Sequence, residues 1–231
     1  MVNHTELRSP VEAVALSWSG GKDSCLALRE LRRAPDIRVE ALITTVTRDF
    51  DRISMHGVRR VLLERQAASL GLPLYQVQIS KGATNQEYET EMGSAFAAFH
   101  DRGVASVAFG DLFLEDVRAY RQRLLARHGM VGRYPIWGRD TTALIKEFID
   151  QGYRTAVVCV DPAQLDPSFA GRVIDERFLA DLPSNIDPCG ENGEFHTFVF
   201  DGPMFEDAVK FSFGEIVCRD SFWFCDLVPA D

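Results

Sequence analysis

A glycine-rich polar hexapeptide at residues 19–24, SGGKDS, separates two segments with different hydrophobic periodicity. Residues 14–18 before it form a short apolar run, and residues 23–33 after it carry leucines at helical spacing. Two adjacent glycines let the backbone turn sharply and approach a ligand without obstruction by a Cβ atom. The unpaired amides that open the following helix lie at the positive end of its dipole, where phosphate binds well. The sequence therefore predicts a strand, a phosphate-binding turn and a helix.

Strand-like and helix-like segments continue to alternate along the first half of the chain. Strands are expected at residues 39–46, 74–79 and 104–109, and helices at residues 58–70 and 85–100. Strands separated by helices of this length are typical of a parallel sheet covered on both faces. We therefore expect an α/β fold in which residues 1–135 form the first domain.

The pattern changes after Tyr134 and Pro135. Helices are expected at residues 141–151 and 174–182, a strand at 155–160, and two or three strands between residues 197 and 227. A stretch rich in proline and glycine lies before the last strands. This pattern predicts a smaller C-terminal α+β domain at residues 136–231, which follows the sheet.

The composition is that of a globular protein with an acidic surface. The 231 residues include 25 Lys and Arg against 34 Asp and Glu, which gives a formal charge of −9. Nucleic-acid binding is disfavoured, because it normally needs concentrated positive charge, although a local basic groove remains open. The start of the chain does not resemble a signal peptide, and its apolar runs are too short to span a membrane. Five scattered cysteines without a CxxC pair favour a reduced, cytoplasmic setting.

The hexapeptide differs from two common nucleotide-binding loops. A Walker loop needs a glycine where Leu16 stands and a Ser or Thr where Asp23 stands. No GxGxxG fingerprint follows the strand. In the hexapeptide, Ser19 and Ser24 supply hydroxyl groups, and Asp23 supplies oxygen ligands for Mg²⁺. The structural alternative is a plain turn in which Asp23 caps the helix.

A second motif, CGENGEFHT at residues 189–197, places two carboxylates, an amide, an imidazole and a hydroxyl within nine positions. Gly190 and Gly193 predict a shaped loop, and Phe195 is expected to begin the strand behind it. Taken alone, the motif is compatible with a polar hairpin whose acidic tip is solvated.

The hexapeptide resembles the pyrophosphate-binding loop of the N-type ATP pyrophosphatases, in the adenine nucleotide α-hydrolase superfamily. Members of that group use ATP to adenylate an oxygen of the acceptor and release pyrophosphate. The resemblance implies a Rossmann-like (HUP-type) sheet in the first domain, with ATP and Mg²⁺ as cofactors and Asp23 as metal ligand. The residues expected around the nucleotide are Ser19, Gly20, Gly21, Lys22, Asp23, Ser24, Thr44, Thr45, His56, Gly110 and Asp111.

The two motifs together resemble the diphthine–ammonia ligase family, which forms an amide on translation elongation factor 2 from ATP and ammonium. Uncharacterised bacterial relatives share both motifs, and the resemblance spans residues 14 to about 205. It implies an AMP- and pyrophosphate-forming amide ligase, in which ammonium attacks an adenylated carboxylate on a protein or small molecule. Catalytic roles are implied for Asp23, Glu191, Glu194 and His196, and substrate binding for Arg118, Arg121, Asn192 and Thr197.

The stretch that follows Gly110 departs from the family pattern. Asp111, Arg118 and Arg121 match it, but the residues between them differ, which leaves the ATP chemistry intact and the acceptor open. Arg118 and Arg121 stand three residues apart on one helical face, where they could reach an anion or simply form a solvated basic surface.

Four other residues have both a functional and a structural interpretation. His56, in the sequence Met55-His56-Gly57, could contact phosphate or substrate, or merely belong to a helix-capping loop. Lys22 either neutralises phosphate or is solvated. Cys25 and Cys189 are interpreted first as packing residues.

Two further functions stay open from the sequence. The same loop occurs in enzymes that modify tRNA or small molecules, and a nucleotide-binding sensor without turnover is a third option. A homodimer is compatible with the sequence. Because both motifs must serve one reaction, we expect the C-terminal domain to fold back over the strand ends, with Glu191, Glu194 and His196 opposite the hexapeptide.

Overall fold

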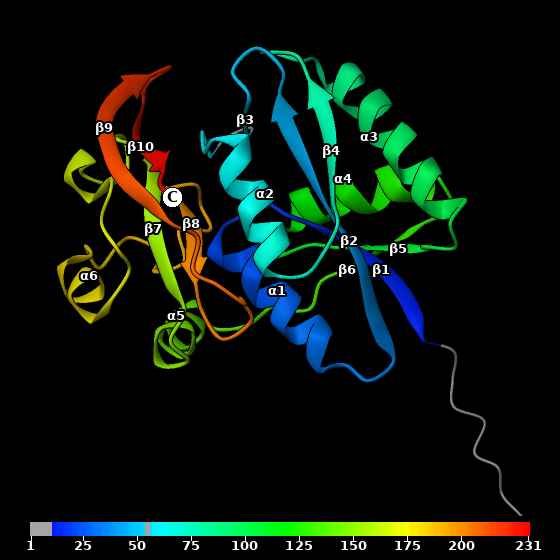
Figure 1. The fold of residues 1–231 in the computed structure, drawn as a ribbon, viewed down its shortest axis with the longest axis horizontal. Helices are drawn as coiled ribbons and strands as arrows, with labels where there is room; N and C mark the ends of the chain where they lie inside the picture. The colour runs from blue at the N-terminus through cyan, green and yellow to red at the C-terminus, as the bar shows by residue number, and fades with distance from the viewer. Residues whose placement is uncertain (1–10, 54–55) are drawn as a thin grey trace, which may run out of the picture.

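The computed structural model describes residues 11–53 and 56–231. Met55, part of the sequence around His56, lies outside the described residues. A mostly parallel sheet A and a smaller antiparallel sheet B organise the chain, with helices on the faces of sheet A (Figure 1). This arrangement confirms the expected α/β, Rossmann-like fold with a smaller C-terminal part.

Sheet A contains six strands, of which five are parallel and the short β3 is antiparallel to β2. Its strands are β1 (Glu12–Ser17), β2 (Ile37–Thr47), β3 (Arg52–Ile53), β4 (Leu74–Ile79), β5 (Ser106–Ala108) and β6 (Val131–Arg133). Its helices are α1 (Lys22–Arg33), α2 (Arg60–Ser69), α3 (Asn85–His100) and α4 (Glu115–Ala126). Because β1 lies between β2 and β5, the crevice between the ends of β1 and β5 is the point where the chain direction across the sheet reverses. Ligands of open α/β sheets bind at such a crevice.

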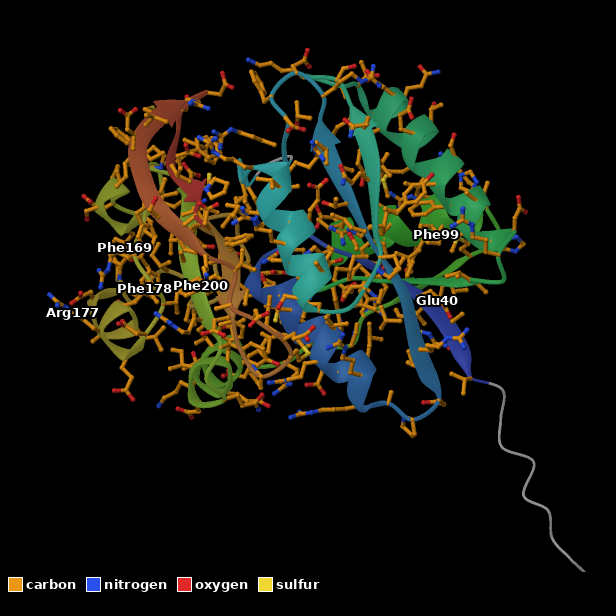
Figure 2. The ribbon with its side chains drawn as sticks, in the orientation of Figure 1. Glu40, Phe99, Phe169, Arg177, Phe178 and Phe200 are labelled. Atoms are coloured by element: carbon orange, nitrogen blue, oxygen red, sulfur yellow. The ribbon has the colours of Figure 1, made fainter. Side chains whose placement is uncertain are left out.

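Sheet B has the strand order β8-β7-β10-β9. Its strands are β7 (Arg154–Val160), β8 (Phe195–Asp201), β9 (Phe211–Arg219) and β10 (Phe222–Pro229). Two α-helices, α5 (Thr141–Asp150) and α6 (Glu176–Asp181), and a 3₁₀ turn, η1 (Pro167–Phe169), complete this part. Figure 2 shows Phe169, Phe178 and Phe200 on the side of sheet B, and Phe99 on the opposite side of the molecule. β8 begins at Phe195, as the sequence predicts.

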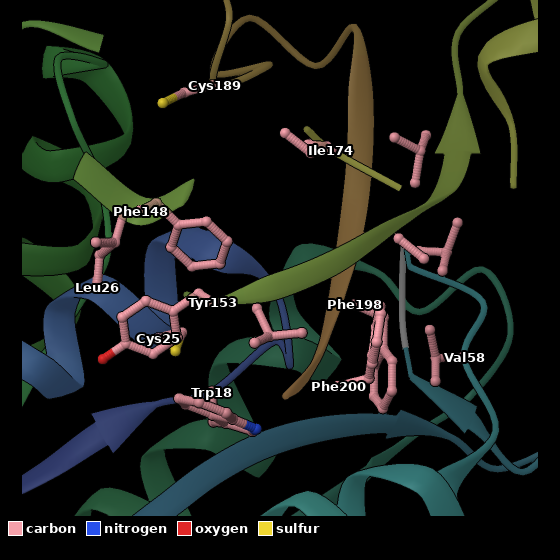
Figure 3. Packing of buried hydrophobic residues seen from close by; sticks show 14 of the residues in the cluster. Trp18, Cys25, Leu26, Val58, Phe148, Tyr153, Ile174, Cys189, Phe198 and Phe200 are labelled. Carbon is pink, nitrogen blue, oxygen red and sulfur yellow. The ribbon is translucent and has the colours of Figure 1, made fainter. Parts of the chain in front are cut away.

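Helix α1 packs between the two sheets. Eight of its twelve residues are buried, including Lys22 and Arg29, because one face meets sheet A and another meets β8. One apolar cluster runs from Trp18 and Cys25 to Phe148, Tyr153 and Phe198 (Figure 3). The core is therefore continuous across residue 135. The domain boundary that the sequence suggests there stays a prediction.

The described helices include none that is long and apolar enough to cross a membrane.

Candidate active site

The hexapeptide forms a sharp turn between β1 and α1. Gly20 has a φ of +80°, a conformation that favours glycine, and a Cβ on it would lie 2.8 Å from the Gln66 side-chain oxygen. Gly21 stands at the position before the first helical residue. The expected strand, turn and helix are therefore present.

Hydroxyl groups stabilise this turn from inside. Ser24 Oγ donates a hydrogen bond of 2.9 Å to the Gly21 carbonyl and lies 3.3 Å from Ser19 Oγ. The Gly21 amide donates to Ser19 Oγ at 3.2 Å. Both serines therefore shape the loop in this structure, in addition to the phosphate contact that the sequence predicts for them.

Strand β8, which carries the end of the second motif, lies directly against the hexapeptide. The Lys22 amide donates to Thr197 Oγ1 at 3.1 Å, and the Val199 amide donates to the Gly20 carbonyl at 2.9 Å. His56 Nδ1 lies 3.2 Å from the Thr197 carbonyl, so this nitrogen carries the proton and donates. The two motifs, about 170 residues apart in sequence, are adjacent in space. The Thr197 hydroxyl joins the two motifs, and the Thr197 carbonyl holds His56, which lies outside both, beside them.

Lys22 is a buried ion-pair partner. Its side chain is 2% exposed, its Nζ lies 2.9 Å from Asp23 Oδ2, and it lies 5.5 Å from the centre of the Phe195 ring. Burial alone would lower the pKa of Lys22, but attraction to Asp23 and Glu191 outweighs it and raises the pKa. The ammonium group therefore stays charged at the start of α1, and the solvated alternative is wrong.

Asp23 has one paired and one unpaired carboxylate oxygen. Oδ2 accepts from Lys22, whereas Oδ1 is buried and has no hydrogen-bond partner. Burial raises the pKa of Asp23, and Lys22 opposes that rise. An unpaired carboxylate oxygen in this position fits a divalent cation bound together with phosphates.

The turn after β5 packs closely on the first residues of α1. A Cβ on Gly110 would lie 2.6 Å from the Asp23 carbonyl carbon and 2.8 Å from the Ser24 amide nitrogen. Asp111 lies 3.0 Å from Arg121, and its Oδ2 is buried without a hydrogen-bond partner. Burial raises the pKa of Asp111, and Arg121 opposes that rise.

Glu191 is the carboxylate of the second motif that reaches the turn after β5. Its Oε1 accepts a hydrogen bond of 2.8 Å from the Leu112 amide. Burial raises the pKa of Glu191 to about 7; the Leu112 hydrogen bond opposes this rise, and the nearby charge of Asp23 adds to it. A carboxyl group that titrates near neutral pH can accept or release a proton during turnover.

Glu194 and Asn192 stabilise their own loop. Glu194 is 2% exposed, and its Oε1 accepts from the Asp187 amide at 3.1 Å and from Asn192 Nδ2 at 3.0 Å. These contacts account for the shape of the loop. Catalysis by Glu194 and substrate binding by Asn192 stay predictions.

His56 and His196 form a pair of imidazoles beside the hexapeptide. Their ring centres are 4.6 Å apart, and His56 Cε1 would lie 3.3 Å from a Cβ on Gly21. Burial and then His196 lower the pKa of His56 to about 3, and burial and then Lys22 lower the pKa of His196 to about 4. Both rings are therefore neutral near pH 7 and can act there through hydrogen bonds.

Other expected site residues lie further from this centre or pack within it. Thr44 and Thr45 stand inside β2, before its last residue, and their contact with adenine stays a prediction. The Arg118 guanidinium stacks on the Trp137 ring at 4.4 Å. Cys25 and Cys189 are fully buried, and burial raises the pKa of each thiol, so the packing interpretation accounts for both.

Gln66 is a residue of the site that the sequence did not reveal. It is fully buried on α2, accepts from Trp18 Nε1 at 3.0 Å, and donates to the carbonyls of Gly20 (3.0 Å) and Val199. One side-chain amide therefore ties the hexapeptide to Trp18, the residue after β1, and to Val199 of β8. The available signal was a glutamine beside Leu62, Leu63 and Ala67 on the buried face of a helix.

Replacing Gln66 with leucine is expected to lower the free energy of unfolding by about 1–3 kcal/mol, because Trp18 Nε1 would be left buried without an acceptor. The measurement is urea unfolding followed by tryptophan fluorescence. Gln122→Leu, at an exposed position on α4, is the matched control and should unfold at the wild-type urea concentration. Equal midpoints for the two variants would contradict the role given to Gln66.

Comparison with known proteins agrees with this arrangement. Residues 12–131 match the family model of the diphthamide synthase N-terminal domain, and residues 140–228 match that of the C-terminal domain. The chain is 24% identical to the diphthine–ammonia ligase of Homo sapiens, over 90% of this chain and 86% of the human protein. It is 26% identical to the Danio rerio enzyme of that name, over 83% of each chain. The Schizosaccharomyces pombe enzyme is 23% identical over 90% of this chain but only 38% of its own length. The chain therefore belongs to the diphthamide synthase family.

Proposed function

We propose that this protein is an ATP-dependent amide ligase of the diphthine–ammonia ligase type, which forms AMP and pyrophosphate. An acceptor carboxylate would attack the α-phosphate of ATP and expel pyrophosphate. Ammonia, formed when ammonium gives up a proton, would then attack the acyl carbon of the adenylate and displace AMP. The observation that carries the proposal is the contact between the two motifs, in which Thr197 Oγ1 of the second motif accepts a hydrogen bond from the Lys22 amide of the hexapeptide. The names of the relatives support the same activity.

The hexapeptide would hold the β- and γ-phosphates. The Lys22 amide already donates to Thr197, so the phosphates would meet the next amides of the first turn of α1, those of Asp23 and Ser24. The loop formed by Ser19, Gly20 and Gly21 and the charged Lys22 add positive potential. Gly110 lets the turn after β5 approach this loop closely. Such preorganised donors stabilise the charge that develops on the departing pyrophosphate.

Asp23 is proposed as the Mg²⁺ ligand, through its unpaired Oδ1. Among residues 11–53 and 56–231, no group of three or more His, Cys, Asp or Glu gathers as a ready-made metal site. One carboxylate together with substrate phosphates is the usual way in which proteins hold Mg²⁺. The ion would neutralise phosphate charge when bound.

Glu191 is proposed as the proton acceptor for the incoming ammonium, because its pKa of about 7 lets it exchange a proton near neutral pH. The neutral rings of His56 and His196 would orient the acceptor and the phosphates by hydrogen bonds. Glu194, Asn192, Arg118 and Thr197 would support this arrangement through the loops and strands that carry them.

We further propose a cytoplasmic protein with a nucleotide-binding part at residues 1–135 and a substrate-side part at 136–231, active alone or as a homodimer. The acceptor carboxylate is carried by a protein or a small molecule. The acidic charge disfavours a tRNA substrate.

The test is product analysis. The protein is incubated with ATP, Mg²⁺, ammonium and an elongation factor 2 that carries the unamidated diphthine residue, and nucleotides are separated by chromatography. AMP and pyrophosphate formed in step with amide on the acceptor are expected. ADP and phosphate as the main products would contradict the proposal, and tight ATP binding without AMP for any acceptor would favour the sensor.

Asp23→Asn is expected to weaken Mg²⁺-dependent ATP binding by about ten- to a hundred-fold, since one charge-assisted contact contributes about 1.5–3 kcal/mol. Calorimetry with and without Mg²⁺ measures the change. Asp36→Ala, in the exposed turn after α1, is the control and should bind as the wild type does. Equal Mg²⁺ dependence in Asp23→Asn and wild type would exclude Asp23 as a ligand.

A further inference from the structure

A separate cavity of about 310 Å³ lies between α3 and α4, near the end of β5. Its walls are mostly rings and apolar chains, with one guanidinium among them: Tyr88, Met92, Phe96, Phe109, Tyr120 and Arg121. Ligand pockets of this size combine such an apolar lining with a few placed polar groups. Neither the hexapeptide nor the second motif lines the cavity.

Arg121 connects this cavity to the proposed active site. Its guanidinium lies 4.4 Å from the centre of the Phe109 ring and 3.0 Å from Asp111 Oδ1, and its side chain is 30% exposed. Asp111 follows Gly110, which packs on Asp23 and Ser24. A guanidinium held by one aromatic face and one carboxylate oxygen keeps further N–H groups for an anion, in a planar arrangement that matches a carboxylate.

Arg118, three residues earlier, is placed differently. It stacks between the rings of Trp137 (4.4 Å) and Tyr134 (5.0 Å) and does not line the cavity. The sequence does not distinguish the two arginines, but the structure does: Arg118 packs between two rings, whereas Arg121 lines the cavity.

We propose that the α3–α4 cavity binds the apolar body of the acceptor substrate, and that Arg121 holds the acceptor carboxylate at the edge of the active site. The assignment of the ligand as acceptor rests on the proposed amide-ligase function. The acceptor must bring a carboxylate to the crevice between β1 and β5. Arg121 lines the cavity and is ion-paired with Asp111, which stands in the turn after β5 beside that crevice. The adenine of ATP is the other candidate occupant, but it carries no charge for Arg121 to meet.

The binding test uses ¹³C-methyl methionine labelling and 3-phenylpropionate as the probe. Saturable movement of the Met92 methyl signal is expected with this carboxylate, and at least tenfold weaker binding with the uncharged 3-phenylpropionamide. Arg121→Gln should weaken the binding of 3-phenylpropionate at least tenfold. Arg123 is exposed on the same helix, so Arg123→Gln should bind the probe as the wild type does.

Val117→Phe provides a second variant that leaves the ion pair of Arg121 intact. Val117 lines the cavity, so the larger side chain should fill it and abolish the shift of Met92. Three results would overturn the proposal: no shift of Met92 in the wild type, equal binding of the acid and the amide, or displacement of the probe by AMP.

Activity separates this proposal from the proposed function. Val117→Phe should retain ATP affinity while the KM for the acceptor rises at least tenfold. If the wild type forms no AMP with any acceptor, the ligase function fails, yet the NMR titration still decides whether the cavity binds carboxylates. If AMP forms and Val117→Phe leaves the acceptor KM unchanged, the cavity proposal is overturned while the ligase function stands.

Discussion

Replacing Glu191 with glutamine is expected to lower amide formation by about a hundredfold or more, with ATP affinity changed by less than about threefold. Glutamine keeps the shape and can still accept the hydrogen bond from the Leu112 amide, which is 2.8 Å long in the wild type. It lacks an oxygen basic enough to take a proton from ammonium. Single-turnover assays of amide formation, paired with calorimetry of ATP binding, separate the two effects.

Glu194→Gln is the matched control within the same motif. Because Glu194 holds the Asp187 amide and the Asn192 side chain, its replacement should lower the melting temperature. Turnover should fall less than it does in Glu191→Gln. A larger loss of turnover in Glu194→Gln than in Glu191→Gln would reverse the assignment of the base.

The pH dependence of turnover follows from the pKa of Glu191, which is about 7. The ionised form is the base, so wild-type turnover at a fixed ammonium concentration should rise with pH and level off above about pH 7. Ammonium is the main form of the nitrogen source throughout this range, so its concentration changes little. Glu191→Gln depends on free ammonia instead, so its turnover should keep rising with pH. Profiles of the two proteins that run parallel from about pH 5.5 to pH 8.5 would exclude Glu191 as the base.

The free energy of unfolding should fall with rising pH, in contrast to turnover, which should rise. The folded pKa of about 7 lies above the unfolded value of 4.5, so the folded protein binds the extra proton. The stability that protonated Glu191 contributes is complete below about pH 4.5 and is lost as pH rises through about 7. The melting temperature of Glu191→Gln relative to the wild type should therefore increase between these pH values.

Local signals in the sequence predicted most of the fold. The change from the apolar run to helical spacing around the hexapeptide predicted β1, the turn and α1, and most other strands and helices agree to within a few residues. β6, which contains only Val131, Gly132 and Arg133, was not predicted, because three residues with a central glycine carry no periodicity. It forms because Ser106–Ala108 of β5 offers an edge for pairing.

The division of labour within the site could not be predicted, because it depends on tertiary contacts. Glu191 and Glu194 look alike in the motif. They differ in their partners, because Glu191 accepts from the Leu112 amide, 79 residues earlier in the chain, whereas the partners of Glu194 lie in its own loop. Gln66 looks like an ordinary polar residue of α2 until its partners, Trp18, Gly20 and Val199, surround it. Each distinction arises where distant segments meet.

Gly110→Ala is expected to disrupt the phosphate loop more than any single side-chain removal there. The new Cβ would lie 2.6 Å from the carbonyl carbon of Asp23, 2.7 Å from its oxygen and 2.8 Å from the Ser24 amide nitrogen. These are backbone atoms at the start of α1, so no rotamer change relieves the contact. Overpacking of this kind costs about 1–3 kcal/mol, or roughly 2–12 °C in melting temperature for a protein of this size.

The same displacement should weaken ATP binding at least tenfold, because the amides that hold phosphate would move with Asp23 and Ser24. Gly93→Ala is the control: it lies inside α3, and the three atoms nearest to its Cβ, the first at 2.7 Å, all belong to the side chain of His128. That ring can turn aside, and alanine favours a helix, so Gly93→Ala should keep both its melting temperature and its ATP affinity. Calorimetry and thermal unfolding of the two variants therefore test whether the close approach of Gly110 to α1 shapes the nucleotide site; equal ATP affinity in both would show that it does not.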